Sequence, residues 1–249
     1  MLLENKVAVI YGAGGSIGGA VAHAFAREGA RVFLAGRTQA SLDEVADEIR
    51  SNGGEADTAI VDALDEQAVD KFVDGIVKQA GHIDISFNLI SYGDVQELLL
   101  KISVEDFLQP IMNAMRTHFL TTRAAVRHMA KGGSGVILHF GGGGPQTLPG
   151  LGGFKIALDA IEGLRRQWAL EFGKQGIRVI TIKTGGITDS IPEDFLGRNE
   201  IVAGIQQAAL LNRTATLADV GNVAAFVASD QARTMTSTEI NISCGAIVD

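Results

Sequence analysis

The chain has 249 residues, 46% of them hydrophobic, and a net charge of −8 from 21 basic and 29 acidic residues. This composition predicts one α/β domain over residues 1–249, and the evenly spread acidic charge argues against a nucleic-acid surface. A single cysteine excludes an intrachain disulfide and a cysteine-rich metal site, so we expect no metal. The start lacks a signal-peptide pattern and no apolar run approaches about 18 residues, so we expect a cytoplasmic protein with no membrane span.

The stretch from Lys6 to Arg37 has the pattern of a strand, a glycine-rich turn, a helix and a second strand. Residues 7–10 form an apolar run typical of a central parallel strand, apolar residues then recur at helical spacing up to Gly29, and residues 31–35 are apolar again. Glycines in such a turn let backbone N–H groups approach a pyrophosphate at the start of the helix. We therefore predict a βαβ unit that binds a dinucleotide; the alternative is a tight turn without a ligand.

The end of the second predicted strand indicates which dinucleotide binds. Folds of this kind that bind NAD place an acidic residue there for the ribose 2′-hydroxyl, whereas this chain has Gly36 followed by Arg37. A guanidinium binds a 2′-phosphate well, so Arg37, helped by Thr38, predicts NADP(H) in preference to NAD(H). The alternative is a solvated surface arginine.

Helices and strands alternate along the rest of the chain, which predicts a doubly wound parallel sheet of about seven strands in three αβα layers. Ser41 and Glu44 form a predicted capping box for the next helix, and Pro110 predicts a break in the long helical segment at about 103–129. A substrate-side segment is expected at about 189–211. The remaining predictions are strands at 56–61, 83–88, 135–140, 177–182 and 239–244 and helices at 66–79, from Lys155, and from a cap at Thr216.

The glycine turn resembles that of the short-chain dehydrogenase/reductase family, G-x-x-x-G-x-G, with Gly12 and Gly18 in place, Ser16 at the middle glycine and Tyr11 at the usual threonine. The resemblance runs from Lys6 to about Val248 and implies the Rossmann fold and a nicotinamide cofactor. It implies that Asp62 contacts adenine, with helix capping as the alternative, and that Asn88, the one residue kept from the N-N-A-G signature, shapes the pocket. The cofactor contacts it implies are Gly12, Ser16, Ile17, Gly18, Asp62, Asn88, Lys155, Ile187 and Thr188.

The catalytic residues of the resembled family are only partly present. Lys155 matches its lysine, and Asn113 matches the helical asparagine that holds a water leading to that lysine; the alternatives are a surface lysine and an amide that solvates a helix kink. The substrate-polarising serine aligns with Gly142. The catalytic tyrosine aligns with Leu151, or with Leu148 at the seven-residue spacing of related enoyl reductases, and neither leucine moves a proton.

The tyrosines and histidines of the chain include candidates for a replacement proton donor. Tyr92, just beyond the fourth strand, is the first candidate, with a core or pocket-wall role as its alternative. Tyr11, His118 and His139 are weaker candidates.

The leading hypothesis is an NADP(H)-dependent oxidoreductase that acts on a small carbonyl or alcohol by an altered proton route. The alternatives are a catalytically silent nucleotide-binding or structural subunit and a carbon–carbon double-bond reductase. The helix from Lys155 carries more apolar residues than one sheet-facing side needs, so we expect a homo-oligomer, a tetramer or dimer, with Trp168 as an anchor.

Overall fold

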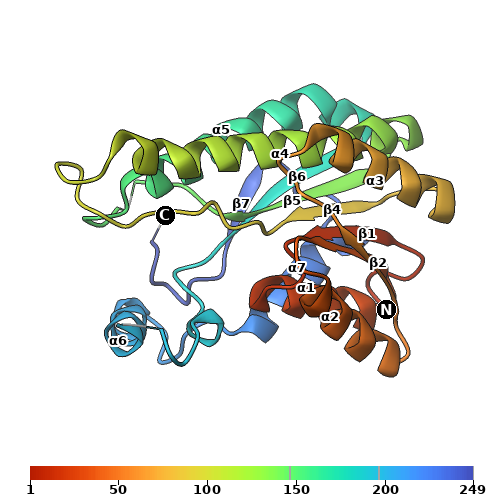
Figure 1. Ribbon diagram of the computed structural model, residues 1–249. Coiled ribbons are helices and arrows are strands. Elements are labelled where there is room, and N and C mark those ends of the chain that lie inside the picture. The colour runs from red at the N-terminus through yellow and green to blue at the C-terminus, as the bar shows by residue number, and fades with distance from the viewer. Residues whose placement is uncertain (146, 196, 249) are drawn as a thin grey trace.

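The computed structural model describes residues 1–145, 147–195 and 197–248, and these residues form a seven-stranded parallel sheet between two helical layers (Figure 1). The strand order is β3-β2-β1-β4-β5-β6-β7. The chain therefore starts in the middle of the sheet, builds one half outward, and returns to build the other half. The predicted doubly wound parallel sheet is confirmed.

The strands are β1 (Val7–Tyr11), β2 (Arg31–Gly36), β3 (Glu55–Ile60), β4 (Ile85–Asn88), β5 (Gly135–Gly141), β6 (Ile177–Lys183) and β7 (Thr238–Asn241). Every residue of β1 and β4 is buried, as is usual for parallel strands covered on both faces. Tyr11 pairs with Ala35 of β2 and with Asn88 of β4. The carboxyl ends of β1, β2 and β4 therefore meet at one edge, where the order of the sheet reverses and where ligands bind in such folds.

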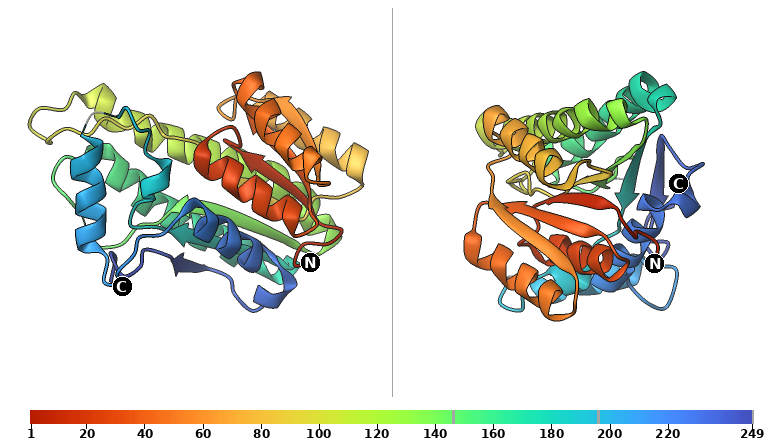
Figure 2. Two further views of the ribbon diagram at one scale, coloured as in Figure 1. Left: turned by 90° about the horizontal axis from the view of Figure 1, so that it is seen from below. Right: turned by 90° about the vertical axis from the view of Figure 1, so that its right-hand side faces the viewer.

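Helices cover both faces of this sheet (Figures 1 and 2). One layer holds α1 (Ser16–Arg27), α2 (Gln39–Ser51) and α7 (Leu217–Ala228), and the other holds α3 (Glu66–Ala80), α4 (Val104–Gly132) and α5 (Gly152–Phe172). Figure 2 shows α6 (Arg198–Ala208) at the same end of the molecule as the connection between β4 and α4. Short 3-10 helices are η1 (Gly173–Gln175), η2 (Thr188–Ser190) and η3 (Asp230–Ala232).

Three predicted boundaries are wrong. Helix α2 begins at Gln39 with Thr38 as its N-cap, and the Ser41 hydroxyl donates to the Thr38 carbonyl at 3.2 Å, so Ser41 caps nothing. Helix α5 begins at Gly152, ahead of Lys155. Strand β7 ends at Asn241, before a turn in which Cys244 has a φ of 55°, a left-handed conformation that a strand does not adopt.

Pro110 does not break α4, contrary to the prediction. It lies near the start of a continuous helix, where its missing N–H removes a single intrahelical hydrogen bond. Neighbouring α5 packs closely on this turn, since a Cβ at Gly153 would lie 1.8 Å from the Phe107 oxygen and 3.0 Å from Pro110 Cγ. Pro110 therefore lies inside α4, where this helix contacts α5.

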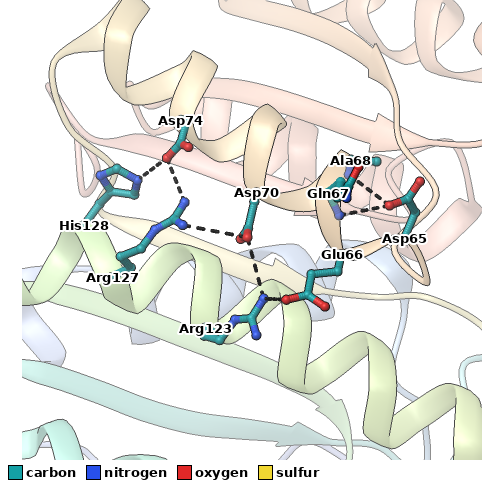
Figure 3. Close-up of polar contacts among 9 residues, drawn as sticks. All are labelled: Asp65, Glu66, Gln67, Ala68, Asp70, Asp74, Arg123, Arg127 and His128. Atoms are coloured by element: carbon teal, nitrogen blue, oxygen red, sulfur yellow. Dashed lines mark hydrogen bonds and ion pairs between the residues drawn. The ribbon is translucent and has the colours of Figure 1, made fainter.

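Ion pairs join α3 to α4 along their outer surface (Figure 3). Arg123 contacts Glu66 at 2.7 Å, and Asp74 accepts from both Arg127 and His128, each at 2.7 Å. Asp65 caps α3 by accepting from the backbone of its first turn. Each exposed pair contributes little free energy alone, but together they fix how α4 lies beside α3.

Within the described ranges, no helix combines the length and apolar character needed to cross a membrane.

Candidate functional site

A cavity of about 390 Å³ lies at the carboxyl ends of the first four strands. Its lining comes from the ends of these strands, from the segments that follow them, and from two residues within α4. The lining residues are Tyr11, Gly12, Gly15, Ala35, Gly36, Arg37, Val61, Asp62, Ala63, Leu64, Leu89, Ile90, Ser91, Gly93, Asn113 and Thr117. Predicted site residues Gly12, Arg37, Asp62 and Asn113 therefore share one cavity, at the edge where the sheet order reverses.

The glycine turn after β1 leaves no room for a side chain at Gly12 or Gly18. Gly12 has a φ of 79°, and a Cβ there would lie 2.6 Å from the Leu89 oxygen; a Cβ at Gly18 would lie 2.2 Å from the Gly12 oxygen. Helix α1 then begins at Ser16 with Gly15 as its N-cap and no side-chain cap, so the backbone N–H groups of Ser16 and Ile17 lie at an uncapped helix start. A bare turn leading into an uncapped helix fits a pyrophosphate.

Arg37 and Asp62 flank the cavity on the side of β2 and β3. Arg37 is exposed, and among the described residues its guanidinium has no hydrogen bond or ion pair. Thr38 makes no side-chain cap for α2. Asp62 uses Oδ1 to accept the Leu64 N–H at 3.0 Å, which closes a turn beside the cavity.

Two asparagines shape the segment that follows β4. Asn88 is buried; its amide nitrogen donates to Thr121 Oγ1 of α4 at 3.2 Å, and its oxygen accepts the Ile90 N–H at 3.0 Å. Asn113 donates to the Tyr92 carbonyl at 2.8 Å. Both amides thus tie α4 to the cavity wall.

The side chain of Tyr92 lies among buried groups of α4 and β5. Its hydroxyl is 3.0 Å from His118 Nε2 and donates to the Phe140 carbonyl at 3.3 Å, and only 7% of the residue is exposed. Burial raises the pKa of this phenol. Both the position and the pKa argue against the expectation that Tyr92 faces the cleft and supplies the catalytic proton. Tyr11 is equally deep, and burial also raises the pKa of its phenol.

Helix α5 presents Lys155 and Asp159 on one face, one turn apart, with Leu151 one turn before them. Lys155 Nζ lies 2.5 Å from Asp159 Oδ2. Asp159 Oδ1 accepts the Gly144 N–H at 3.1 Å, so the same carboxylate also contacts residues 141–144, which we call the polyglycine loop. Leu151 offers Lys155 no polar contact.

The place of the missing serine is filled by a lysine stem. A Cβ at Gly142 would lie 2.6–2.7 Å from Cβ, Cγ and Cδ of Lys183, and Gly142 has a φ of 90°. Lys183 is buried at the end of β6, and its ammonium lies 3.1 Å from Glu239 Oε2. A hydroxyl at position 142 therefore has neither the backbone conformation nor the space it needs.

Beneath the site lies a buried polar cluster. Arg165 donates to Glu162 at 2.7 Å, and Thr181 donates to the same carboxylate at 2.6 Å; burial raises the pKa of Glu162. The rings of His118 and His139 meet edge to face at 4.5 Å. Burial lowers the pKa of both imidazoles, that of His139 to about 3.

The residues expected beside nicotinamide lie after β6, outside the lining of the 390 Å³ cavity. Ile187 is buried in the core below the turn, and the Thr188 hydroxyl lies 3.4 Å from that of Thr214. The predicted substrate-side segment, 189–211, follows these two residues and contains the end of η2 and the whole of α6. Leu196 in this segment lies outside the described residues.

Sequence reasoning missed Asp159, Lys183 and the Glu162–Arg165 pair. Asp159 left a readable signal, because it stands four residues after Lys155. Lys183 left a weaker signal, because it is a charged residue at the end of a largely apolar strand. The contact of Glu162 with Thr181 joins two distant segments and left none.

Comparisons with known proteins cover nearly the whole chain. A family model described as enoyl-(acyl carrier protein) reductase matches residues 12–246. An uncharacterized oxidoreductase, YxbG of Bacillus subtilis, is 31% identical over 98% of this chain and 91% of its own, and versicolorin reductase stcU of Emericella nidulans is 29% identical over 98% and 96%. A crystal structure of NAD⁺-bound xylitol dehydrogenase superposes with a TM-score of 0.89 at 25% identity, covering 98% of this chain and 100% of that one.

Proposed function

The chain belongs to the short-chain dehydrogenase/reductase family of oxidoreductases, whose members bind nicotinamide cofactors, and within it we propose an NADP(H)-dependent enzyme for a small carbonyl or alcohol. The observation that carries the proposal is that Gly12 of the glycine turn and Arg37 line one cavity, while positions 142 and 151 carry no hydroxyl group. The bare glycine turn and the uncapped start of α1 fit a pyrophosphate. Arg37 lines the cavity, and its role in the proposal is to bind the 2′-phosphate. Lys155 lies outside the lining of that cavity, and its role in the proposal is to bind the nicotinamide ribose.

The bound cofactor supplies hydride, and the chain has to hold the substrate and deliver a proton to its oxygen. With Gly142 and Leu151 at the usual positions, neither task falls to a hydroxyl group. Lys155 then provides the cationic group for this chemistry, and its ammonium is paired with Asp159. Asn113 and Asn88 hold the wall opposite α1. This arrangement supports an altered proton route with slow reduction of ordinary ketones.

NADPH is expected to bind more tightly than NADH, and Arg37→Ala is expected to remove most of that preference. A charge-assisted contact with the 2′-phosphate contributes about 1.5–3 kcal/mol, or roughly tenfold to more than a hundredfold in affinity. Fluorescence titration of the purified protein with both cofactors measures the difference. Arg27→Ala, on the far end of α1, is the matched control and leaves the ratio unchanged. Tighter binding of NADH by the wild type contradicts the assignment.

The second candidate is a carbon–carbon double-bond reductase. It is favoured by the description of the matching family model and by the absence of the tyrosine acid, since hydride then goes to carbon and the demand for a phenol is relaxed. A panel of enones and ketones with NADPH separates the candidates by which class is turned over. Binding of NADPH without turnover of either class supports a catalytically silent subunit instead.

Self-association through α4 and α5 is a further expectation. Their outer surface exposes Met112, Phe119, Ile156 and Leu170, the last 79% exposed. The anchor named from sequence is wrong, because Trp168 is only 8% exposed and stacks on Phe119 and Phe172 of its own chain. Leu170 and Ile156 take its place as candidate contacts.

Light scattering at micromolar concentration is expected to give an oligomer, and Leu170→Glu is expected to shift it toward the monomer, because a buried charge at an apolar contact is costly. Ile60→Glu, at an exposed apolar position on β3, is the control and leaves the oligomer intact. A wild-type mass of 26.2 kDa contradicts self-association.

A further inference from the structure

We propose that Asp159 is a positioning residue that binds Lys155 and the polyglycine loop into one unit, and thereby sets the affinity for the nicotinamide half of the cofactor. The inference rests on the proposed function, because it takes Lys155 as a contact of the nicotinamide ribose. Neither the sequence pattern nor the family resemblance assigns a role to this carboxylate.

Asp159 contacts two parts of the chain at once. Its Oδ2 lies 2.5 Å from Lys155 Nζ on the same helix, and its Oδ1 accepts the Gly144 N–H at 3.1 Å from the loop after β5. An ordinary surface pair one turn apart on a helix joins two mobile side chains and contributes little. Here the carboxylate is fixed by a third group, so the lysine is held relative to the loop. The carboxylate stays 45% exposed.

The polyglycine loop is shaped for this contact. A Cβ at Gly143 would lie 2.6 Å from Asp159 Oδ1 and 3.2 Å from Asp159 Cα, so any other residue there pushes the carboxylate away. On the other side, the Lys183 stem fills the space where a Cβ at Gly142 would lie. The loop is therefore held between Asp159 of α5 and Lys183 of β6. Glycine at position 143 and aspartate at 159 depend on each other.

Orientation of Lys155 matters because its ammonium sits on a flexible four-carbon stem. Leu151, one turn before Lys155, provides no acceptor for the ammonium. Asp159, one turn after Lys155, provides one. An ammonium has three donors, so Lys155 keeps donors for ribose hydroxyls while it remains paired. Holding the stem in advance reduces the entropy lost when the cofactor binds.

A double-mutant cycle on NADPH affinity tests whether Asp159 acts through Lys155. The dissociation constant is measured by fluorescence for the wild type, Asp159→Asn, Lys155→Met and the double variant. We expect Asp159→Asn to weaken NADPH binding about tenfold in the wild type and to have no further effect beside Lys155→Met. Equal losses in both backgrounds would mean a general structural role and would overturn the proposal.

A ligand that lacks the nicotinamide half provides the second arm. Adenosine 2′,5′-bisphosphate carries the adenosine and the 2′-phosphate but does not extend to Lys155. Its affinity is expected to stay unchanged in Asp159→Asn and to fall in Arg37→Ala. A loss of its affinity in Asp159→Asn would show that the substitution disturbs the whole site, and would also overturn the proposal.

Gly143→Ala tests the loop contact without changing a charge. We expect the same tenfold weakening of NADPH binding as in Asp159→Asn. Exchange of the Gly144 amide hydrogen is expected to accelerate in Gly143→Ala and Asp159→Ala, and to stay slow in Asp159→Asn, whose amide oxygen still accepts. Glu171→Gln neutralises the carboxylate of another side-chain pair on α5 and serves as the charge-matched control, which we expect to have no effect.

The outcomes separate the two proposals. A wild type that binds neither NADPH nor NADH overturns the proposed function and this inference with it. If the wild type binds NADPH and both Asp159→Asn and Gly143→Ala bind it with the same affinity, only the inference is overturned.

Discussion

Leu151→Tyr is expected to raise NADPH-dependent reduction of a generic diketone at least tenfold. A positioned general acid contributes about 10²–10⁴ in rate, and this chain retains the lysine that would lower the pKa of the new phenol. Position 151 lies one turn before Lys155 on the same face of α5, so the hydroxyl would stand beside the ammonium. The Phe154 ring packs toward Tyr92, at 6.1 Å between ring centroids.

Leu151→Phe is the matched control, because it adds the ring without the hydroxyl and is expected to leave the rate unchanged. No rise in a Leu151→Tyr variant that folds and binds NADPH would mean that the surroundings have diverged along with the acid. High activity of the unmodified protein on the same diketone would contradict the premise, since an effective acid would then already be present.

Adding the serine is not expected to help. Gly142→Ser would place a Cβ within 2.7 Å of three carbons of the Lys183 stem, at a φ of 90° that side chains rarely adopt. The double variant Leu151→Tyr, Gly142→Ser is therefore expected to be less stable and less active than Leu151→Tyr alone. Thermal unfolding and the diketone rate, measured side by side, check this order.

The free energy of unfolding is expected to fall by about 4 kcal/mol between pH 7.5 and pH 5. His118 and His139 are buried, and burial lowers the pKa of each imidazole below its ordinary value, for His139 from 6.5 to about 3. Below pH 6.5 the two imidazoles become protonated in the unfolded chain, whereas burial keeps them neutral in the folded chain. Stability is therefore complete above pH 6.5 and falls with pH, by about 1.4 kcal/mol per pH unit for each imidazole.

Other groups act differently over this range. Burial raises the pKa of Glu162, so this carboxyl takes up its proton more readily in the folded state and partly offsets the loss. Hydrogen bonds from Thr216 lower the pKa of Asp219, whose contribution to stability is present above its ordinary pKa of 3.8 and is lost only as the pH falls below that value. Measurements between pH 7.5 and pH 5 therefore report mainly the two imidazoles.

His139→Leu isolates one imidazole. Neither ring nitrogen of His139 has a hydrogen-bond partner among the described residues, so leucine removes the titrating group and breaks no bond. Urea unfolding at pH 7.5 and pH 5 is expected to show a fall about 2 kcal/mol smaller than in the wild type. His82→Gln, on the exposed surface, is expected to keep the wild-type difference. The same fall in His139→Leu and the wild type would show that this imidazole does not control acid stability.

The sequence alone determined the order and type of the strands and most of the helices, because apolar spacing and glycine turns are local signals. It also predicted the glycine turn after β1, since Gly18 is required by a contact within that turn and Gly12 by a contact with Leu89, which follows the neighbouring strand β4. Its errors fell where a contact from another segment decides the outcome. Pro110, for example, stays within α4, where Gly153 of α5 approaches it closely.

The surroundings of Tyr92 and Gly142 were decided only by the tertiary structure. Tyr92 looked available from its place after β4, yet α4 and β5 bring His118 and the Phe140 carbonyl to its hydroxyl and bury it. Gly142 looked like a simple loss of serine, yet β6 brings the Lys183 stem into the vacated space. These contacts join residues more than 20 positions apart, and no spacing along the chain encodes them. They follow from the parallel pairing of β4, β5 and β6, which brings the ends of distant segments together.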